Sequence, residues 1–139
     1  MYIKKFGQEF KAMYWKNEKL NPEMIAIDTE TTLITNPAIV PDVVLSTVYD
    51  GSGIVYVVKN QDINNFFEVN KDAKLCLWNA AFDMPVLEKL GAPLEPYLES
   101  GRMLDGQILY RLLSIAVRGQ GASKWSLDYV AETILKEVL

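Results

Sequence analysis

The stretch Ile25-Ala26-Ile27-Asp28-Thr29-Glu30-Thr31-Thr32 is a short apolar run that leads directly into two carboxylates. Such a run predicts a β-strand, and the side chains of a strand alternate between its two faces. Asp28 and Glu30 therefore emerge on the same face, while Thr29 points to the other. Two carboxylates this close repel each other, and a hard divalent cation such as Mg²⁺ or Mn²⁺ relieves that repulsion. The pattern indicates a metal site; the alternative is an ordinary solvated junction between strand and loop.

A second apolar run, over residues 74–78, also ends in polar residues. Its continuous apolar character predicts a strand that is buried on both faces. Asn79 follows, and then Asp83 and Pro85. Proline is tolerated in the first turn of a helix, which places Asp83 near a helix N-terminus, where the dipole favours an ionised carboxylate. Asp83 is thus ready to hold a cation or its bound water. The alternative is that Asp83 and Asn79 serve only as helix-start and turn residues.

The rest of the chain predicts an α/β fold with a mixed sheet. Residues 43–49 and 54–58 are rich in β-branched and aromatic side chains, and the Asp50-Gly51-Ser52-Gly53 turn between them predicts an antiparallel hairpin. Helices are expected over residues 6–15, 62–69, 82–90, 105–116 and from 126 onward. A meander of strands followed by a crossover strand implies a sheet flanked by helices.

Three predicted helices have an apolar face at helical spacing, and we expect the face of the helix over residues 105–116 to lie in the core. In the first helix these residues are Phe6, Phe10, Met13 and Tyr14; in the fourth, Ile108, Leu109, Leu112 and Leu113; in the last, Leu127, Val130, Ile134, Leu135 and Val138. Asp105 and Ser126 are the expected N-caps of the last two helices.

Length and composition exclude several classes of protein. The 139 residues, half of them hydrophobic, fit one domain with one core. No apolar run approaches the roughly 20 residues that span a bilayer, so no membrane association is expected. The absence of histidine excludes Ser-His-Asp and Cys-His catalysis and every zinc site with a histidine ligand. The single cysteine, Cys76, is expected to be a buried hydrophobic residue in an intracellular, cytoplasmic protein.

The distribution of charge leaves room for a nucleic-acid partner despite the net charge of -4. Residues 1–20 contain five lysines and two acids, and residues 106–127 contain Arg111, Arg118 and Lys124 without any acid. Both stretches are candidates for phosphate contacts. The alternative for each is an ordinary solvated face.

Taken together, the two carboxylate stretches resemble the motifs of the 3′→5′ exonuclease superfamily with four acidic residues, most closely the branch that proofreads for family A DNA polymerases. Asp28-Thr29-Glu30-Thr31 resembles the first motif, and Asn79-Ala80-Ala81-Phe82-Asp83 resembles the second. Met103-Leu104-Asp105 and Trp125-Ser126-Leu127-Asp128 are also similar to that branch. The resemblance covers about residues 22–135 and implies a ribonuclease-H-like, mixed five-stranded sheet flanked by helices. Its first three strands are antiparallel, and strands four and five run parallel to the first.

The resemblance also implies a site. Asp28, Glu30 and Asp83 would be catalytic and would hold two Mg²⁺ or Mn²⁺ ions about 4 Å apart, which activate a water and stabilise the leaving oxygen. The substrate would be the 3′ end of single-stranded DNA or RNA. The implied substrate-binding residues are Thr29 through its backbone amide, Leu33, Ile34, Asn79 and Phe82.

One part of the family pattern is missing. The third motif, a Tyr or His followed four residues later by the fourth metal-binding Asp, does not occur in the sequence. Asp105 and Asp128 are candidate substitutes, although both fit better as a cap or a surface acid. We therefore expect residues 1–139 to be one C-terminally incomplete exonuclease domain that lacks its last helices. A polymerase domain or a C-terminal fragment would be its partner. The alternatives are a binding module that hydrolyses little and an interaction domain with an exposed apolar face.

Overall fold

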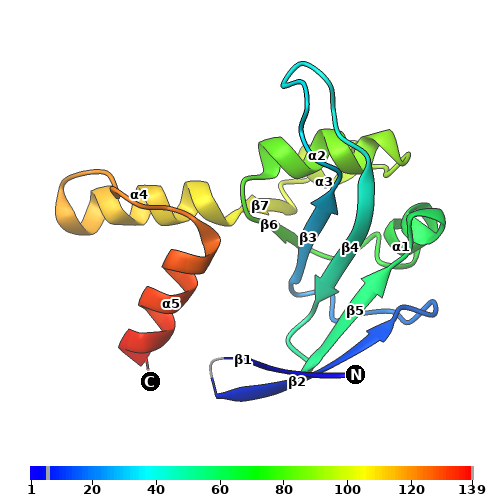
Figure 1. The fold of residues 1–139 in the computed structure, drawn as a ribbon, viewed down its shortest axis with the longest axis horizontal. Coiled ribbons are helices and arrows are strands. Elements are labelled where there is room, and N and C mark those ends of the chain that lie inside the picture. The colour runs from blue at the N-terminus through cyan, green and yellow to red at the C-terminus, as the bar shows by residue number, and fades with distance from the viewer. Residues whose placement is uncertain (6, 139) are drawn as a thin grey trace.

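The computed structural model describes residues 1–5 and 7–138, which form a mixed sheet with helices on one face (Figure 1). In the described residues the sheet has seven strands in the order β1-β2-β5-β4-β3-β6-β7. Their bounds are β1 Tyr2–Lys5, β2 Gln8–Tyr14, β3 Ile25–Thr31, β4 Val43–Tyr49, β5 Ile54–Val58, β6 Leu75–Leu77 and β7 Met103–Asp105. The α/β class and the mixed sheet predicted from the sequence are confirmed.

The strands from β5 to β7 have the directions that the resemblance implied. β3 is antiparallel to β4, and β4 is antiparallel to β5. β6 is parallel to β3, and β7 is parallel to β6. The expected hairpin of β4 and β5 is confirmed, with Gly51 and Gly53 at the positive φ values of 86° and 83° that its turn requires. The expected number of five strands is wrong, because β1 and β2 extend the sheet beyond β5.

The helix predicted over residues 6–15 is therefore wrong where the structure describes it. β2 lies parallel to β5, and β1 pairs with β2 as an antiparallel hairpin. The apolar residues predicted for one helical face instead contribute to strand packing, and the Phe10 ring meets the Tyr49 ring edge-on at 5.7 Å. Pairing with the free edge of β5 outweighs a weak local helical pattern. Phe6 lies outside the described residues.

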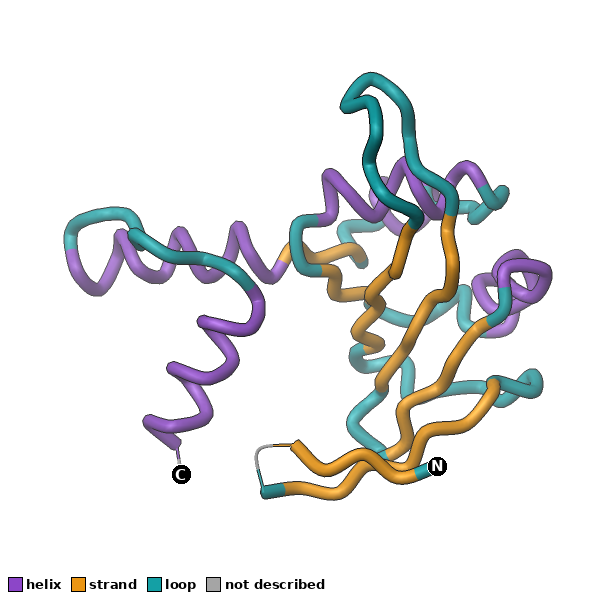
Figure 2. Tube along the Cα trace, viewed as in Figure 1, coloured by secondary structure: helices purple, strands orange, loops and turns teal. Residues whose placement is uncertain are grey.

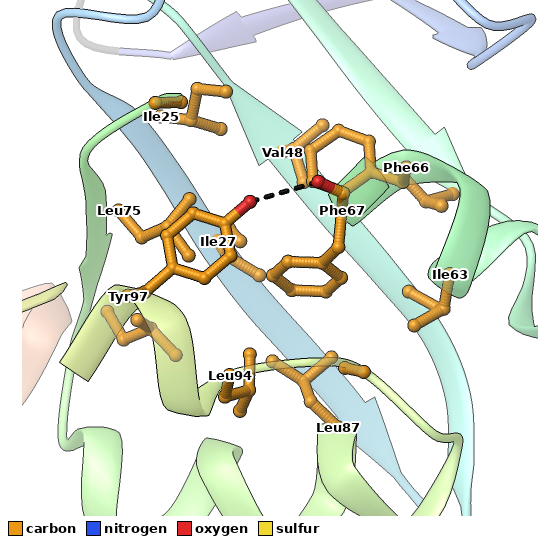
Figure 3. Packing of buried hydrophobic residues seen from close by; sticks show 14 of the residues in the cluster. Ile25, Ile27, Val48, Ile63, Phe66, Phe67, Leu75, Leu87, Leu94 and Tyr97 are labelled. Carbon is orange, nitrogen blue, oxygen red and sulfur yellow. Dashed lines mark hydrogen bonds between the residues drawn. The ribbon is translucent and has the colours of Figure 1, made fainter. Parts of the chain in front are cut away.

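Helices α1, α2 and α3 cover one face of the sheet and form the core with it (Figure 3). The helices of the fold are α1 Ile63–Val69 after the 3₁₀ turn Asn60–Asp62, α2 Ala80–Lys89, α3 Glu95–Glu99, α4 Gly106–Arg118 and α5 Leu127–Val138. Phe66 and Phe67 are both 1% exposed and contact each other edge-to-face at 5.5 Å. The Tyr97 hydroxyl donates hydrogen bonds to the Phe67 carbonyl at 3.0 Å and the Asn70 carbonyl at 3.1 Å. Each large apolar side chain buried in this way contributes about 1.5–3 kcal/mol.

Helices α4 and α5 extend away from the rest of the chain as an arm (Figures 1 and 2). The predicted core face of α4 is wrong: Ile108, Leu109, Leu112 and Leu113 are 50–60% exposed. In α5, Val130 is buried, whereas Leu127 and Ile134 are 45% exposed; the side chains of Leu135 and Val138 lie outside the described part. Helical spacing predicts an apolar face but does not say which surface covers it. No described helix is long and apolar enough to cross a membrane.

Candidate carboxylate site

β3 presents its carboxylates on the face of the sheet that the helices leave open. Burial alternates along the strand, with Ile25, Ile27 and Thr29 buried and Asp28 and Glu30 exposed. The predicted alternation is therefore confirmed. Asp28 lies opposite Thr47 of β4, and the register of the two strands shifts directly after Glu30.

The surroundings of Asp28 disfavour the ionised form of its carboxyl. Partial burial raises the pKa of its carboxyl, and the charge of Glu30 raises it further, while a hydrogen bond from the Thr29 backbone acts in the opposite direction. The mutual repulsion expected from the spacing of Asp28 and Glu30 is thus present in the folded chain. A cation bound between these carboxylates would relieve it.

The second motif begins helix α2 at the end of β6. Asn79 has the left-handed backbone angles φ 65° and ψ 59°, which make the sharp turn from strand to helix. Asp83 lies in the first turn of α2, as predicted. Pro85 falls further inside the helix than expected, because α2 starts at Ala80.

Asp83 is buried and contacts the first motif directly. Its side chain is 3% exposed, and its Oδ1 accepts a hydrogen bond of 2.5 Å from the Thr29 hydroxyl. Burial raises the pKa of Asp83 to about 6; the hydrogen bonds from Thr29 oppose the shift, and the charges of Asp28 and Asp105 add to it. Asp83 is therefore close enough to both acids to be affected by their charge.

Asp105 organises the backbone beside Asp83. Its Oδ1 accepts hydrogen bonds from the amides of Gln107 at 2.9 Å and Ile108 at 3.1 Å, which confirms the predicted cap of α4. The same carboxylate also accepts from the amides of Asn79 at 3.3 Å and Ala80 at 2.8 Å. One acid thus fixes the starts of both α2 and α4. Because its carboxylate accepts all these hydrogen bonds, Asp105 fits the role of a helix cap better than the role of a substitute metal ligand.

The three predicted metal ligands are near one another but do not form one cluster. Asp28 and Glu30 occupy the open face of β3, whereas Asp83 is hydrogen-bonded to Thr29, whose side chain belongs to the helix-covered face. Within the described residues, no group of three or more acidic or cysteine side chains is arranged to hold a metal ion. The donor chemistry nevertheless suits a hard cation, because all three side chains offer carboxylate oxygens.

Two apolar hollows are lined in part by residues of the two motifs. The first lies between the loop of residues 32–42 and α2, and Ile34 and Phe82 both line it. The second lies on the open face of the sheet, where Asp28 is accompanied by Tyr49, Trp78 and Leu127 of α5. Of the predicted substrate contacts, the structure thus brings Ile34 and Phe82 together, while Leu33 is 90% exposed at the loop surface.

Two of the three basic side chains between residues 106 and 127 lie against aromatic rings of the arm. Arg111 is 5.1 Å from the centre of the Trp125 ring, and Lys124 is 5.4 Å from that of Tyr129. Such cation–π pairs leave the charge accessible to solvent or to an anion.

Sequence reasoning missed two contributions to the site. It assigned Thr29 a backbone role, whereas the Thr29 hydroxyl binds Asp83. It assigned Asp105 one helix, whereas Asp105 also fixes the turn before α2. The alternation along β3 already turned Thr29 inward, and a buried hydroxyl needs a partner, so a signal for the first contact was present. Comparison of the sequence with models of known protein families and with curated proteins finds no match.

Proposed function

We propose that this chain provides the carboxylates of a metal-dependent 3′→5′ exonuclease, which hydrolyses the terminal phosphodiester bond at the 3′ end of DNA or RNA. The observation that carries the proposal is the contact between the two motifs. Thr29 of the first motif donates a hydrogen bond to Asp83 of the second, although 54 residues separate them in the chain. A contact of this kind is expected if the two motifs form one site, since it brings a residue of each motif together in the folded chain.

The arrangement of strands supports the same proposal. The order β5-β4-β3-β6-β7, with β3 at its centre, is compatible with a ribonuclease-H-like sheet. In that fold we place the first motif on the central strand and the second at the start of the helix after the neighbouring parallel strand. Ligands of α/β sheets commonly bind beyond the carboxyl ends of such strands.

In this proposal Asp28, Glu30 and Asp83 hold the metal ions, Mg²⁺ or Mn²⁺. Two such ions supply an activated water and stabilise the leaving oxygen in phosphodiester hydrolysis. Asp28 and Glu30 lie together on one strand face, and the Thr29 hydroxyl fixes the position of Asp83 on the covered side of the same strand. Asp83 has a pKa of about 6, so at pH 7 most of its carboxyl is ionised and available to a cation.

In this proposal, the apolar hollow between the loop of residues 32–42 and α2 binds the terminal nucleotide. Ile34 from the loop and Phe82 from α2 line it, and Phe82 directly precedes Asp83 in the sequence. Aromatic and aliphatic side chains of this kind bind bases without sequence preference. Leu33, 90% exposed in the same loop, is the residue we assign to the next base.

A binding module that hydrolyses little is the second candidate. It is favoured by the position of Asp83, whose carboxyl is directed toward Thr29 rather than toward Glu30, and by the three matched carboxylates where the family has four. Such a module would bind a 3′ end with a metal and cleave slowly. The two candidates differ in turnover and not in binding.

The test is digestion of a labelled single strand in the presence of Mn²⁺, with the wild type, Asp28→Asn and Asp72→Asn compared side by side. Asp72→Asn is the matched control, because Asp72 is a 70% exposed acid that pairs with Lys19 away from the site. We expect trimming from the 3′ end by the wild type and by Asp72→Asn, and none by Asp28→Asn. Binding without trimming in all three proteins would favour the module. Neither binding nor trimming by the wild type would contradict both candidates.

A further inference from the structure

Lys89, in the last turn of α2, ties the loop of residues 32–42 to the helix. Its Nζ lies 2.6 Å from Oδ1 of Asp42 and donates a hydrogen bond of 3.0 Å to the carbonyl of Val40. Both partners belong to the returning leg of the loop, just before β4. A lysine at a helix C-terminus is also favoured by the helix dipole, which helps to hold its ammonium group at this position.

The loop is internally braced, so it can move as a unit. At its neck, the Thr32 amide donates to the Asp42 carbonyl at 2.9 Å, and the Asp42 amide donates to the Thr32 hydroxyl at 3.2 Å. Near its tip, Asn36 accepts from the amide of Ala38 through its side chain at 2.9 Å and from the amide of Ile39 through its carbonyl at 3.1 Å. Figure 1 shows the loop standing beyond the end of the sheet, next to α2.

Within the described residues, Lys89 makes the ion pair and the hydrogen bond that join this loop to α2. The other contacts across the gap are apolar, and they enclose the hollow that Ile34 and Phe82 line. Apolar contacts are not directional and allow the loop to slide or tilt over the helix. An ion pair with a second hydrogen bond to a carbonyl fixes both the distance and the direction of approach. The width of the hollow therefore depends on Lys89.

We propose that Lys89 is a positioning residue, which holds the loop of residues 32–42 over α2 and so sets the affinity of the hollow for the terminal nucleotide of the substrate. This inference rests on the proposed function for the identity of the ligand. Lys89 itself lies at the opposite end of α2 from Asp83 and does not touch the reacting atoms. Its loss weakens binding and leaves the carboxylates unchanged.

The test compares Lys89→Met and Asp42→Asn with the rescue variant Lys89→Arg and the control Lys71→Met. Lys71 is a matched control because it forms an exposed pair with Glu68, at 3.6 Å, away from the loop. Two quantities are measured for each protein: amide hydrogen exchange in residues 33–41, and the affinity for a fluorescent single-stranded oligothymidylate in Ca²⁺ buffer. Exposed ion pairs contribute modestly, so we expect the affinity to fall about fivefold in Lys89→Met. Exchange in the loop should become faster, and Lys89→Arg and Lys71→Met should resemble the wild type.

Each result decides a separate question. Unchanged loop exchange in Lys89→Met would show that Lys89 does not hold the loop and would overturn the inference. Faster exchange with an unchanged affinity would reduce Lys89 to a structural role and would also overturn it. If the wild type does not bind the oligonucleotide, the proposed function fails at that point, and the exchange data still show whether Lys89 fixes the loop.

Discussion

Thr29 and Asp83 share a buried hydrogen bond that joins the central strand β3 to the first turn of α2. The contact gives a buried carboxyl a partner within the protein, which limits the cost of removing it from water. It also directs Oδ1 of Asp83 toward Thr29, on the helix-covered side of the strand.

Replacing Thr29 by valine should destabilise the fold and raise the pKa of Asp83. Valine matches threonine in shape but removes the hydroxyl donor, which leaves a buried carboxyl with one hydrogen bond fewer, at a cost of about 1–3 kcal/mol. Because the hydrogen bonds from Thr29 oppose the rise in the pKa of Asp83, that pKa should move above about 6. Urea denaturation gives the first quantity, and an NMR titration of the carboxyl carbon gives the second. Thr35→Val, in the exposed part of the loop, is the control and should change neither.

The stability of the protein should depend on pH through Asp83. Its folded pKa, about 6, lies above the ordinary value of 3.8, so the folded state binds the proton more tightly than the unfolded state. The corresponding stabilisation is fully present below about pH 4 and is lost as the pH rises through 6, by on the order of 2 kcal/mol. Asp83→Asn should remove this dependence, which is measured by urea denaturation between pH 4 and 7.5. Because the charges of Asp28 and Asp83 interact, the difference between the two proteins reports Asp83 together with its coupling to Asp28. Equal slopes in the two proteins would contradict a raised pKa for Asp83.

The strands around the site could be predicted because their signals are local. Apolar runs that end in polar turns mark β3 and β6, and a glycine-rich turn between two β-branched segments marks the hairpin of β4 and β5. The N-terminal segment has no such local signal. Its apolar spacing suits a helix as well as a strand, and its pairing with β5 depends on residues that lie more than 40 positions away. Long-range pairing of this kind cannot be inferred from a periodic pattern.

The sequence predicted which residues belong to the candidate site, but it did not predict how their side chains are arranged. Strand alternation placed Asp28 and Glu30 on one face, and the structure confirms this. The position of Asp83 relative to them depends on how α2 packs on β3, and that packing directs its carboxyl to Thr29. The resemblance suggested three ligands in one cluster, whereas the folded chain holds one of them by a competing hydrogen bond. Tertiary packing decides which of several possible partners a carboxyl such as that of Asp83 contacts.

The apolar face of α4 should contribute little to the stability of this chain. Ile108 and Leu112 are 51% and 57% exposed, so glutamine at both positions should change the free energy of unfolding by less than about 1 kcal/mol. The same measurement on Phe66→Ala should give a loss of about 3–5 kcal/mol, because Phe66 is 1% exposed in the core. A large loss in the α4 variant would show that this face is covered in solution.

Divalent cations should raise the melting temperature of the wild type through Asp28 and Glu30. A ligand that binds the native state stabilises it by mass action, and millimolar Mg²⁺ or Mn²⁺ should therefore shift the transition upward. The double variant Asp28→Ala/Glu30→Ala should lose this shift. Without metal, the same variant should be at least as stable as the wild type, because it removes the repulsion that contributes to the raised pKa of Asp28. The matched control is Glu68→Ala/Asp72→Ala, which removes two exposed acids away from the site and should keep the full shift. If the Asp28/Glu30 variant and this control respond equally to Mn²⁺, the cation binds elsewhere and the two carboxylates of β3 are not its ligands.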